Sequence, residues 1–267
     1  YAPAYAPILL PMEGQVALFP RGDNVVIVGT HFLPNDTTRH ADHGHSLPWL
    51  DPGTQSGMLD QAGLFLRNID GGQVTSVQSI GDTEGAFLLE VPSGRYLLST
   101  ETWSPQQRRA GRLRMGFESY PVPEDVASLS DILMLQPLSN EPEVLESIIS
   151  QALRRPEIHA GQTFAIAWEV YGLGFRSESL TFELSINQIN RSIFRKISQF
   201  LRLTSRAQPT LISWREPGPL TPGPVFRYLN LDLPDLDPGN YVIRLVLRTS
   251  GRGEVISTRV FRVQDKG

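Results

Sequence analysis

The sequence predicts an all-β protein made of two tandem immunoglobulin-like β-sandwich domains with one or two short helices. Its 267 residues are enough for two domains of ordinary size, and 40% of them are hydrophobic, which is sufficient material for a core. The 23 glycines and 21 prolines are spread between short apolar runs. Such a density of turn residues is typical of β-rich chains.

A weak internal repeat supports two domains rather than one. Residues 86–117 and 227–261 both read as three strands separated by two turns. Each copy places a glycine two residues before a tyrosine at a strand entrance, Gly94 before Tyr96 and Gly239 before Tyr241. Glycine supplies the turn dihedral, and tyrosine anchors the corner with a buried ring and a hydroxyl that reaches the backbone. We therefore expect an extended arm over 1–11 and sandwiches over 12–136 and 137–267.

Short β-branched and apolar runs between turn signals predict the individual strands. The expected ranges are 15–19, 24–29, 63–68, 74–80, 87–91, 95–102, 112–117, 129–135, 162–170, 179–187, 210–214, 225–233, 240–248 and 254–263. The apolar stripe over 141–153, with Asn140 as a cap, predicts a helix. The stretch 189–203 fits either a helix or a strand. Residues 34–60 have no periodicity and read as a long loop.

Composition excludes several classes of protein. A net charge of −4 argues against a nucleic-acid binder that depends on phosphate contacts. The absence of cysteine excludes disulfides, thiolate metal sites and cysteine nucleophiles. No apolar run reaches the roughly 18–20 residues of a membrane span, so we expect no transmembrane segment. The charge is uneven, with 8 basic and 15 acidic residues up to position 136 and 16 basic and 13 acidic residues after it.

Catalytic patterns are weak throughout the chain. Ser46 lacks the glycine two residues later that a nucleophile elbow needs, and Gly172-Leu173-Gly174 lacks the third glycine of a dinucleotide loop. His40, His43 and His45 are weak metal candidates, because His-x-x-His-x-His in a loop lacks a helix to orient the imidazoles. A polar, solvated loop is the preferred interpretation of these histidines. We therefore expect no enzyme and no cofactor.

Segments suited to binding another protein are easier to identify than catalytic patterns. The first is the proline-spaced arm, which favours an extended conformation and carries large side chains. The second is the 34–60 loop with its tryptophan, and the third is an arginine-rich hairpin next to another tryptophan. The candidate partner-binding residues in these segments are Tyr1, Tyr5, Ile8, Leu9, Trp49, Trp103, Arg108, Arg109 and Arg112.

Three segments in the second half resemble one bacterial family. Leu129-Ser130-Asp131-Ile132-Leu133-Met134-Leu135 is similar to the "LSDILL" segment of GWxTD-domain proteins. Trp168–Leu173 and Leu236–Val263 resemble their "fEvYnL" strand and final hairpin. The Gly-Trp-x-Thr-Asp element itself is absent. The resemblance implies an exported or envelope-associated bacterial protein and supplies no catalytic residues. Because the chain begins at Tyr1 rather than Met, we expect an upstream piece, such as a signal peptide.

These observations favour a non-catalytic structural or adaptor subunit that binds other proteins. We expect it in the periplasm or at the cell surface, docked on the soluble face of a bacterial envelope membrane complex. The alternative is a carbohydrate- or small-ligand-binding sandwich, which requires exposed aromatic side chains such as Trp49 and Trp103. A metal-binding protein that uses the His40–His45 loop is a further alternative.

Overall fold

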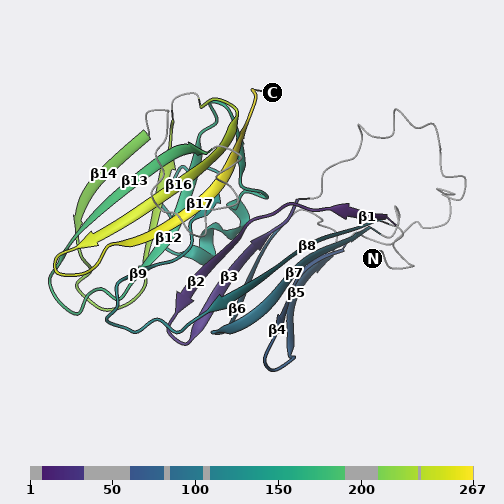
Figure 1. Cartoon of the computed structure of the whole chain (residues 1–267), viewed down its shortest axis with the longest axis horizontal. Coiled ribbons are helices and arrows are strands. Elements are labelled where there is room, and N and C mark those ends of the chain that lie inside the picture. Colours follow the sequence, from purple (N-terminus) through teal and green to yellow (C-terminus); the bar gives the residue numbers. More distant parts are fainter. Residues whose placement is uncertain are drawn as a thin grey trace, which may run out of the picture.

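The structure, a computed structural model, describes residues 8–32, 61–80, 85–104, 109–189, 210–233 and 236–266. Within these ranges the chain forms seventeen strands and one short 3₁₀ helix, so the predicted all-β class is confirmed. The strands make two β-sandwiches, each with one large and one small sheet (Figure 1).

The first sandwich contains the first eight strands of the chain. Its large sheet has the order β1-β8-β7-β4-β5, and its small sheet has the order β2-β3-β6. The bounds are β1 (Ile8–Pro11), β2 (Val16–Arg21), β3 (Asn24–Thr30), β4 (Gln61–Asn68), β5 (Val74–Ile80), β6 (Ala86–Pro92), β7 (Gly94–Ser104) and β8 (Arg109–Ser119).

The second sandwich repeats this plan. Its large sheet has the order β11-β17-β16-β13-β14, and its small sheet has the order β10-β12-β15, with β9 also pairing with β12. The bounds are β9 (Ser128–Leu129), β10 (Leu133–Leu135), η1 (Leu145–Gln151), β11 (Glu157–His159), β12 (Phe164–Tyr171), β13 (Ser179–Ile189), β14 (Thr210–Pro217), β15 (Val225–Leu231), β16 (Gly239–Thr249) and β17 (Val255–Gln264). In both sandwiches a short strand pairs in parallel with the last one, β1 with β8 and β11 with β17.

The tyrosine corners predicted from the repeat are present in both sandwiches. The Tyr96 hydroxyl donates to the Pro92 carbonyl oxygen at 2.8 Å, and the Tyr241 hydroxyl donates to the Asp237 carbonyl oxygen at 2.8 Å. Both rings are buried. Each tyrosine also lies opposite a phenylalanine on the next strand, Tyr96 opposite Phe117 and Tyr241 opposite Phe261. The structural repeat therefore extends beyond the turn to the aromatic pair of the final hairpin.

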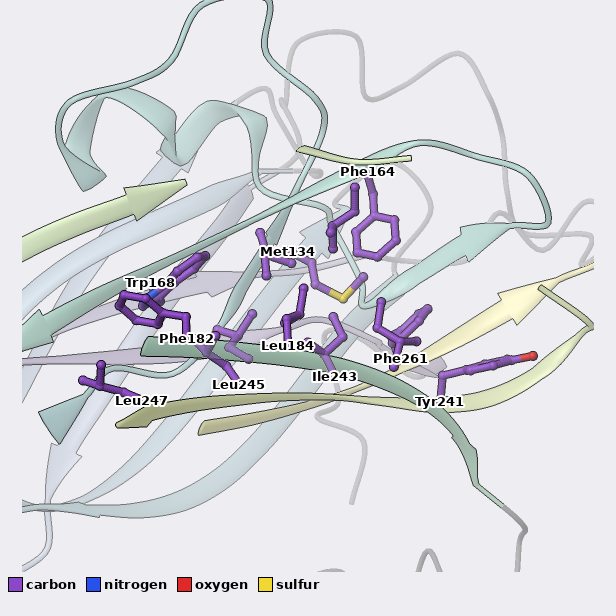
Figure 2. Close-up of a cluster of buried hydrophobic side chains, with 14 of the residues drawn as sticks. Met134, Phe164, Trp168, Phe182, Leu184, Tyr241, Ile243, Leu245, Leu247 and Phe261 are labelled. Atoms are coloured by element: carbon purple, nitrogen blue, oxygen red, sulfur yellow. The ribbon is translucent and has the colours of Figure 1, made fainter. Parts of the chain in front are cut away.

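Aromatic rings fill the core of the second sandwich (Figure 2). Trp168 lies edge-on to Phe182 at 6.0 Å between ring centroids, and Phe182 stacks on Trp214 at 5.0 Å. Trp168 is a core residue, since its side chain is 1% exposed. His31 follows β3 directly, where it is buried and its ring stacks on that of Phe87.

The two small sheets pack against each other, so the described residues form four β-layers and three hydrophobic cores. Ala17, Phe19, Val26 and Val28 of the first sandwich share the middle core with residues of β10, β12 and η1. Every residue of β12 is buried. Its side chains alternate, with Phe164, Ile166, Trp168 and Val170 in the core of the second sandwich and the small Ala165 and Ala167 in the middle core.

Buried polar groups connect the sandwiches across this middle core. The Gln15 amide nitrogen donates to the carbonyl oxygens of Met134 (2.8 Å) and Leu153 (2.6 Å), and its oxygen accepts from the Met134 amide at 3.1 Å. Arg259 donates to the carbonyl oxygens of Ile132 (2.7 Å) and Val16 (2.9 Å). Burial lowers the pKa of Arg259, and the negative charge of Asp131 opposes that shift.

A buried ion pair lies at one end of the same interface. The Arg21 guanidinium bonds both oxygens of Glu169, at 3.2 and 2.5 Å, and Glu169 is 2% exposed. The Tyr171 hydroxyl donates to Glu169 at 2.7 Å. Burial, followed by the charge of Glu169 and this hydrogen bond, raises the pKa of Tyr171. Breaking this pair would leave a buried charge uncompensated. The ion pair therefore favours one relative position of the two sandwiches.

Several sequence expectations need correction. The 129–135 strand was expected to end the first half, but β9 and β10 pair with β12 in the second sandwich. The helix expected over 141–153 is a 3₁₀ helix of 7 residues, and its cap position is Val144 rather than Asn140. β1 and β11, which pair through only a few residues, were not anticipated as strands. The helix-or-strand question over 189–203 concerns residues outside the described ranges, apart from Ile189 at the end of β13.

Candidate binding site on the outer sheet face

The outward face of the large sheet of the first sandwich carries a shallow hollow of about 110 Å³. Strand register explains its composition, because residues directly opposite one another on neighbouring strands share a face. Gln61 lies opposite Trp103, which lies opposite Ala110. The next row is formed by Gln78, Gly63, Glu101 and Arg112. We refer to these residues together with Phe65 as the outer-sheet hollow.

Gly63 creates the depression. A Cβ atom at this position would lie 2.8 Å from the Phe65 ring and 3.1 Å from a side-chain carbon of Gln78. The Phe65 ring therefore lies over the glycine backbone and occupies space that any side chain would need. The half-buried rings of Phe65 and Trp103 and the small Ala110 give the hollow its apolar surface.

An ion pair crosses the hollow. The Arg112 Nε atom donates to Glu101 at 2.9 Å, a terminal nitrogen donates to the other Glu101 oxygen at 3.3 Å, and the Ser99 hydroxyl donates at 2.7 Å. Partial burial would raise the pKa of Glu101, but the hydrogen bonds from Ser99 and Arg112 and the nearby arginine charges outweigh it. The pKa of Glu101 therefore lies below its usual value.

This arrangement suits binding better than proton transfer. A carboxylate with a lowered pKa is a weak base, and Glu101 is the one carboxylate among the described residues that line the hollow. An aromatic ring beside a guanidinium held by a carboxylate instead offers an apolar surface and directional donors. Within the described part of the chain, no three histidines or carboxylates come together as a metal ion would require.

The structure places some of the predicted partner-binding residues together. Trp103 and Arg112 both line the hollow. Arg109 lies in β8 opposite Ser104, one position before Ala110 and thus on the other face of the strand. Ile8 and Leu9 lie in β1, where they pair with Arg109 and Ala110. The other candidates, Tyr1, Tyr5, Trp49 and Arg108, and the metal candidates His40, His43 and His45, lie outside the described residues.

Sequence reasoning missed Gln61, Gly63, Phe65, Gln78 and Glu101. The signal that could have identified Glu101 is the period-two alternation of β7, in which the even-numbered residues Tyr96, Leu98, Thr100 and Thr102 are buried. Counting from them places Glu101 and Trp103 on the opposite face. Their neighbours on β4 and β8 could not be chosen, because that choice requires the strand register.

No family model matches the chain, and no curated protein matches it. Solved structures do show a likeness. The red sea bream transglutaminase is 8% identical at a TM-score of 0.28, over 95% of this chain and 32% of its own. The FN1–FN3 domains of chicken CNTN1 are 11% identical at a TM-score of 0.28, over 97% of this chain and 69% of theirs. The chain thus spans about a third of the transglutaminase, and likenesses at this level carry no argument about activity.

Proposed function

We propose that the protein is a non-catalytic adaptor that binds another protein through the large sheet of its first sandwich. The observation that carries this proposal is the outer-sheet hollow, in which Trp103 lies beside the Glu101–Arg112 pair on an exposed sheet face. Tryptophan and arginine are the residue types that most often dominate the binding energy of protein interfaces.

The surroundings of the hollow favour a protein partner. The hollow is well below the 300–1,000 Å³ of typical small-molecule pockets. The face continues along the strands through a row in which Val74 lies opposite Arg67 and Arg67 opposite Leu97. Val74 and Leu97 are both exposed. An open face with apolar and aromatic groups matches the composition of an interface core.

Charge indicates the kind of partner surface. Arg67, Arg112 and Arg114 lie on this face, and Glu101 pairs with Arg112 and Arg114. The excess of positive charge would complement an acidic patch. The four stacked layers and their buried polar contacts would present this face as a rigid surface, which reduces the entropy lost on binding.

The partner proposed is a bacterial envelope membrane complex, with this chain on its soluble face in the periplasm or at the cell surface. The support is the resemblance of the 129–135 segment and the final hairpin to GWxTD-domain proteins. In the described ranges, no helix is both long enough and apolar enough to cross a bilayer.

Co-purification under mild conditions tests the adaptor function. We expect the tagged chain to retain a membrane complex from its native cells, and Trp103→Ala and Arg112→Ala each to reduce the retained amount about tenfold. Arg248→Ala is the matched control, since Arg248 also pairs with carboxylates but lies on the second sandwich. Equal retention by Arg112→Ala and the wild type would contradict the proposal.

A carbohydrate-binding module is the second candidate, and Trp103 and Phe65 beside polar side chains are the observation that favours it. Sugars bind to aromatic faces flanked by such groups. A glycan array distinguishes the two functions. A chain that purifies alone and binds glycans through Trp103 is a carbohydrate-binding module, whereas a chain that binds no glycan and retains a protein complex is an adaptor.

A further inference from the structure

Three loops meet where the linker crosses between the sandwiches. They are the linker 120–127, the turn 172–178 after β12, and the loop 218–224 before β15. Gly172 and Gly174 have φ values of 72° and 88°, and a Cβ atom on either would collide with a carbonyl oxygen, that of Val126 or that of Thr221. Backbone therefore packs directly on backbone. Arg252 strengthens this contact, because its guanidinium donates to the carbonyl oxygens of Asp125 and Gly172 at 2.7 Å each.

Phe175 lines two neighbouring hollows that these loops help to form. The first hollow, of about 320 Å³, lies between the sandwiches and is lined by residues of all three loops and by the β2–β3 turn. The second, of about 560 Å³, lies between the linker and the β16–β17 turn. Both have Phe175 in their lining. We call the two hollows together the junction groove.

Exposed apolar side chains are frequent in the three loops, and two of them, Val126 and Phe175, line the junction groove. Tyr120, Val126, Phe175 and Leu220 are 66%, 48%, 49% and 97% exposed and all belong to the three loops. They are four of the eleven exposed large hydrophobic residues in the described part of the chain. Scattered exposed side chains need no explanation, but a cluster beside a hollow marks a contact surface.

The lining of the first hollow favours a ring-bearing occupant. Pro20, Pro123, Pro222 and Pro224 line it together with Tyr171 and Phe175. Arg21 also lines it, but its guanidinium is already paired with Glu169 and Glu146. The hollow therefore offers rings and no unpaired guanidinium, and Glu124 is the one carboxylate among the described residues that line it. Surfaces of this composition bind proline-containing segments in an extended conformation, which loses little entropy on binding.

We propose that the junction groove binds the segment Tyr1–Pro7 of a second copy of this chain. The sequence Tyr-Ala-Pro-Ala-Tyr-Ala-Pro has two prolines, two tyrosine rings and no charged side chain. Its proline and tyrosine rings therefore match the four prolines and two aromatic rings that line the first hollow of the groove. This self-association is independent of the adaptor function and uses a different surface.

Reach excludes binding of this segment within one copy. β1 runs parallel to β8 and begins with Ile8 opposite Arg109, whereas the groove begins beyond Ser119 at the other end of β8 (Figure 1). The eleven residues of β8 span about 35 Å. Seven residues extend at most about 25 Å, which is shorter than this distance. Only a second copy can supply the segment.

The contact joins two different surfaces, so it is heterologous. Each copy keeps one free groove and one free segment, and copies add head to tail rather than closing as a symmetric dimer. Sedimentation velocity over a concentration series is the primary test. We expect species larger than a dimer to grow with concentration. A chain that remains monomeric throughout, or that stops at a dimer, would overturn the proposal.

Two variants make the test specific. Deleting residues 1–7 removes the segment and leaves β1 intact, and Phe175→Ala removes the half-exposed ring that separates the hollows. Each variant alone should be monomeric. An equimolar mixture should form a heterodimer that grows no further, since one chain supplies only the groove and the other only the segment. Association that persists in either variant alone, or a mixture that stays monomeric, would refute the pairing.

A peptide experiment tests the contact directly. A labelled peptide Tyr-Ala-Pro-Ala-Tyr-Ala-Pro should bind the deletion variant, and adding Phe175→Ala should weaken binding about tenfold or more. Val144→Ala, at a 50% exposed position before η1, and Trp103→Ala in the outer-sheet hollow should leave binding unchanged. Equal binding with and without Phe175, or weaker binding in the two controls, would overturn the proposal.

Discussion

Replacing Gln15 by alanine should destabilise the whole protein, although Gln15 lies outside every strand. Its side chain makes three hydrogen bonds to the second sandwich, two as donor and one as acceptor. Gln15 is 2% exposed, so water does not replace these bonds. The Met134 carbonyl keeps a bond from the Leu153 amide, whereas the Met134 amide and the Leu153 carbonyl lose the partners that Gln15 provides.

A buried polar group without a partner costs about 1–3 kcal/mol, so two of them predict a loss of about 2–6 kcal/mol. For a chain of this size each kcal/mol lowers the melting temperature by about 2–4 °C. Urea unfolding followed by tryptophan fluorescence measures the loss. Gln73→Ala, at an exposed position between β4 and β5, is the matched control and should change stability by less than about 0.5 kcal/mol.

The same titration tests whether the sandwiches unfold together. Because the small sheets share the middle core, we expect a single transition in the wild type. A Gln15→Ala loss as small as that of Gln73→Ala would show that the three hydrogen bonds contribute little. Two separate wild-type transitions would refute the view that the middle core couples the sandwiches.

Three further predictions concern local structure. Gly172→Ala should cost about 1–3 kcal/mol more than Gly22→Ala in urea unfolding, because that is the usual cost of forcing atoms into filled space. Both glycines have positive φ, but only Gly172 has backbone within 4 Å of a new Cβ. Tyr96→Phe and Tyr241→Phe should each cost about 1 kcal/mol, and the double variant should show the sum, because each loses one corner hydrogen bond in a separate sandwich; clear non-additivity would contradict this. The lowered pKa of Glu101 contributes stability that is present above its ordinary value of 4.5 and is lost as the pH falls through the lower folded-state pKa. Acid should therefore destabilise the wild type more steeply than Glu101→Gln, and parallel pH profiles of the two would contradict this.

The candidate site was half visible in the sequence. Trp103 and Arg112 were identified as contact residues from residue type and from their position near a turn. Glu101 belonged to the same site but read only as an ordinary charged strand residue. It becomes part of a surface because β7 and β8 pair in a register that places it opposite Arg112. That register is a long-range choice among alternatives with similar local patterns.

Local signals determined the β class, most strand positions and the two tyrosine corners. Each depends on residues close together in the chain, such as the alternation in β7 or Gly239 two residues before Tyr241. The stacking of the two small sheets was decided only by the tertiary structure. The sign of it in the sequence is the mainly apolar composition of β12, whose residues are all buried in the structure. A strand has this composition when both of its faces are covered. A run of apolar residues does not specify what covers the second face. Ala165 and Ala167 face the first sandwich because small side chains let two sheets approach closely, and that complementarity exists only once both sheets have formed.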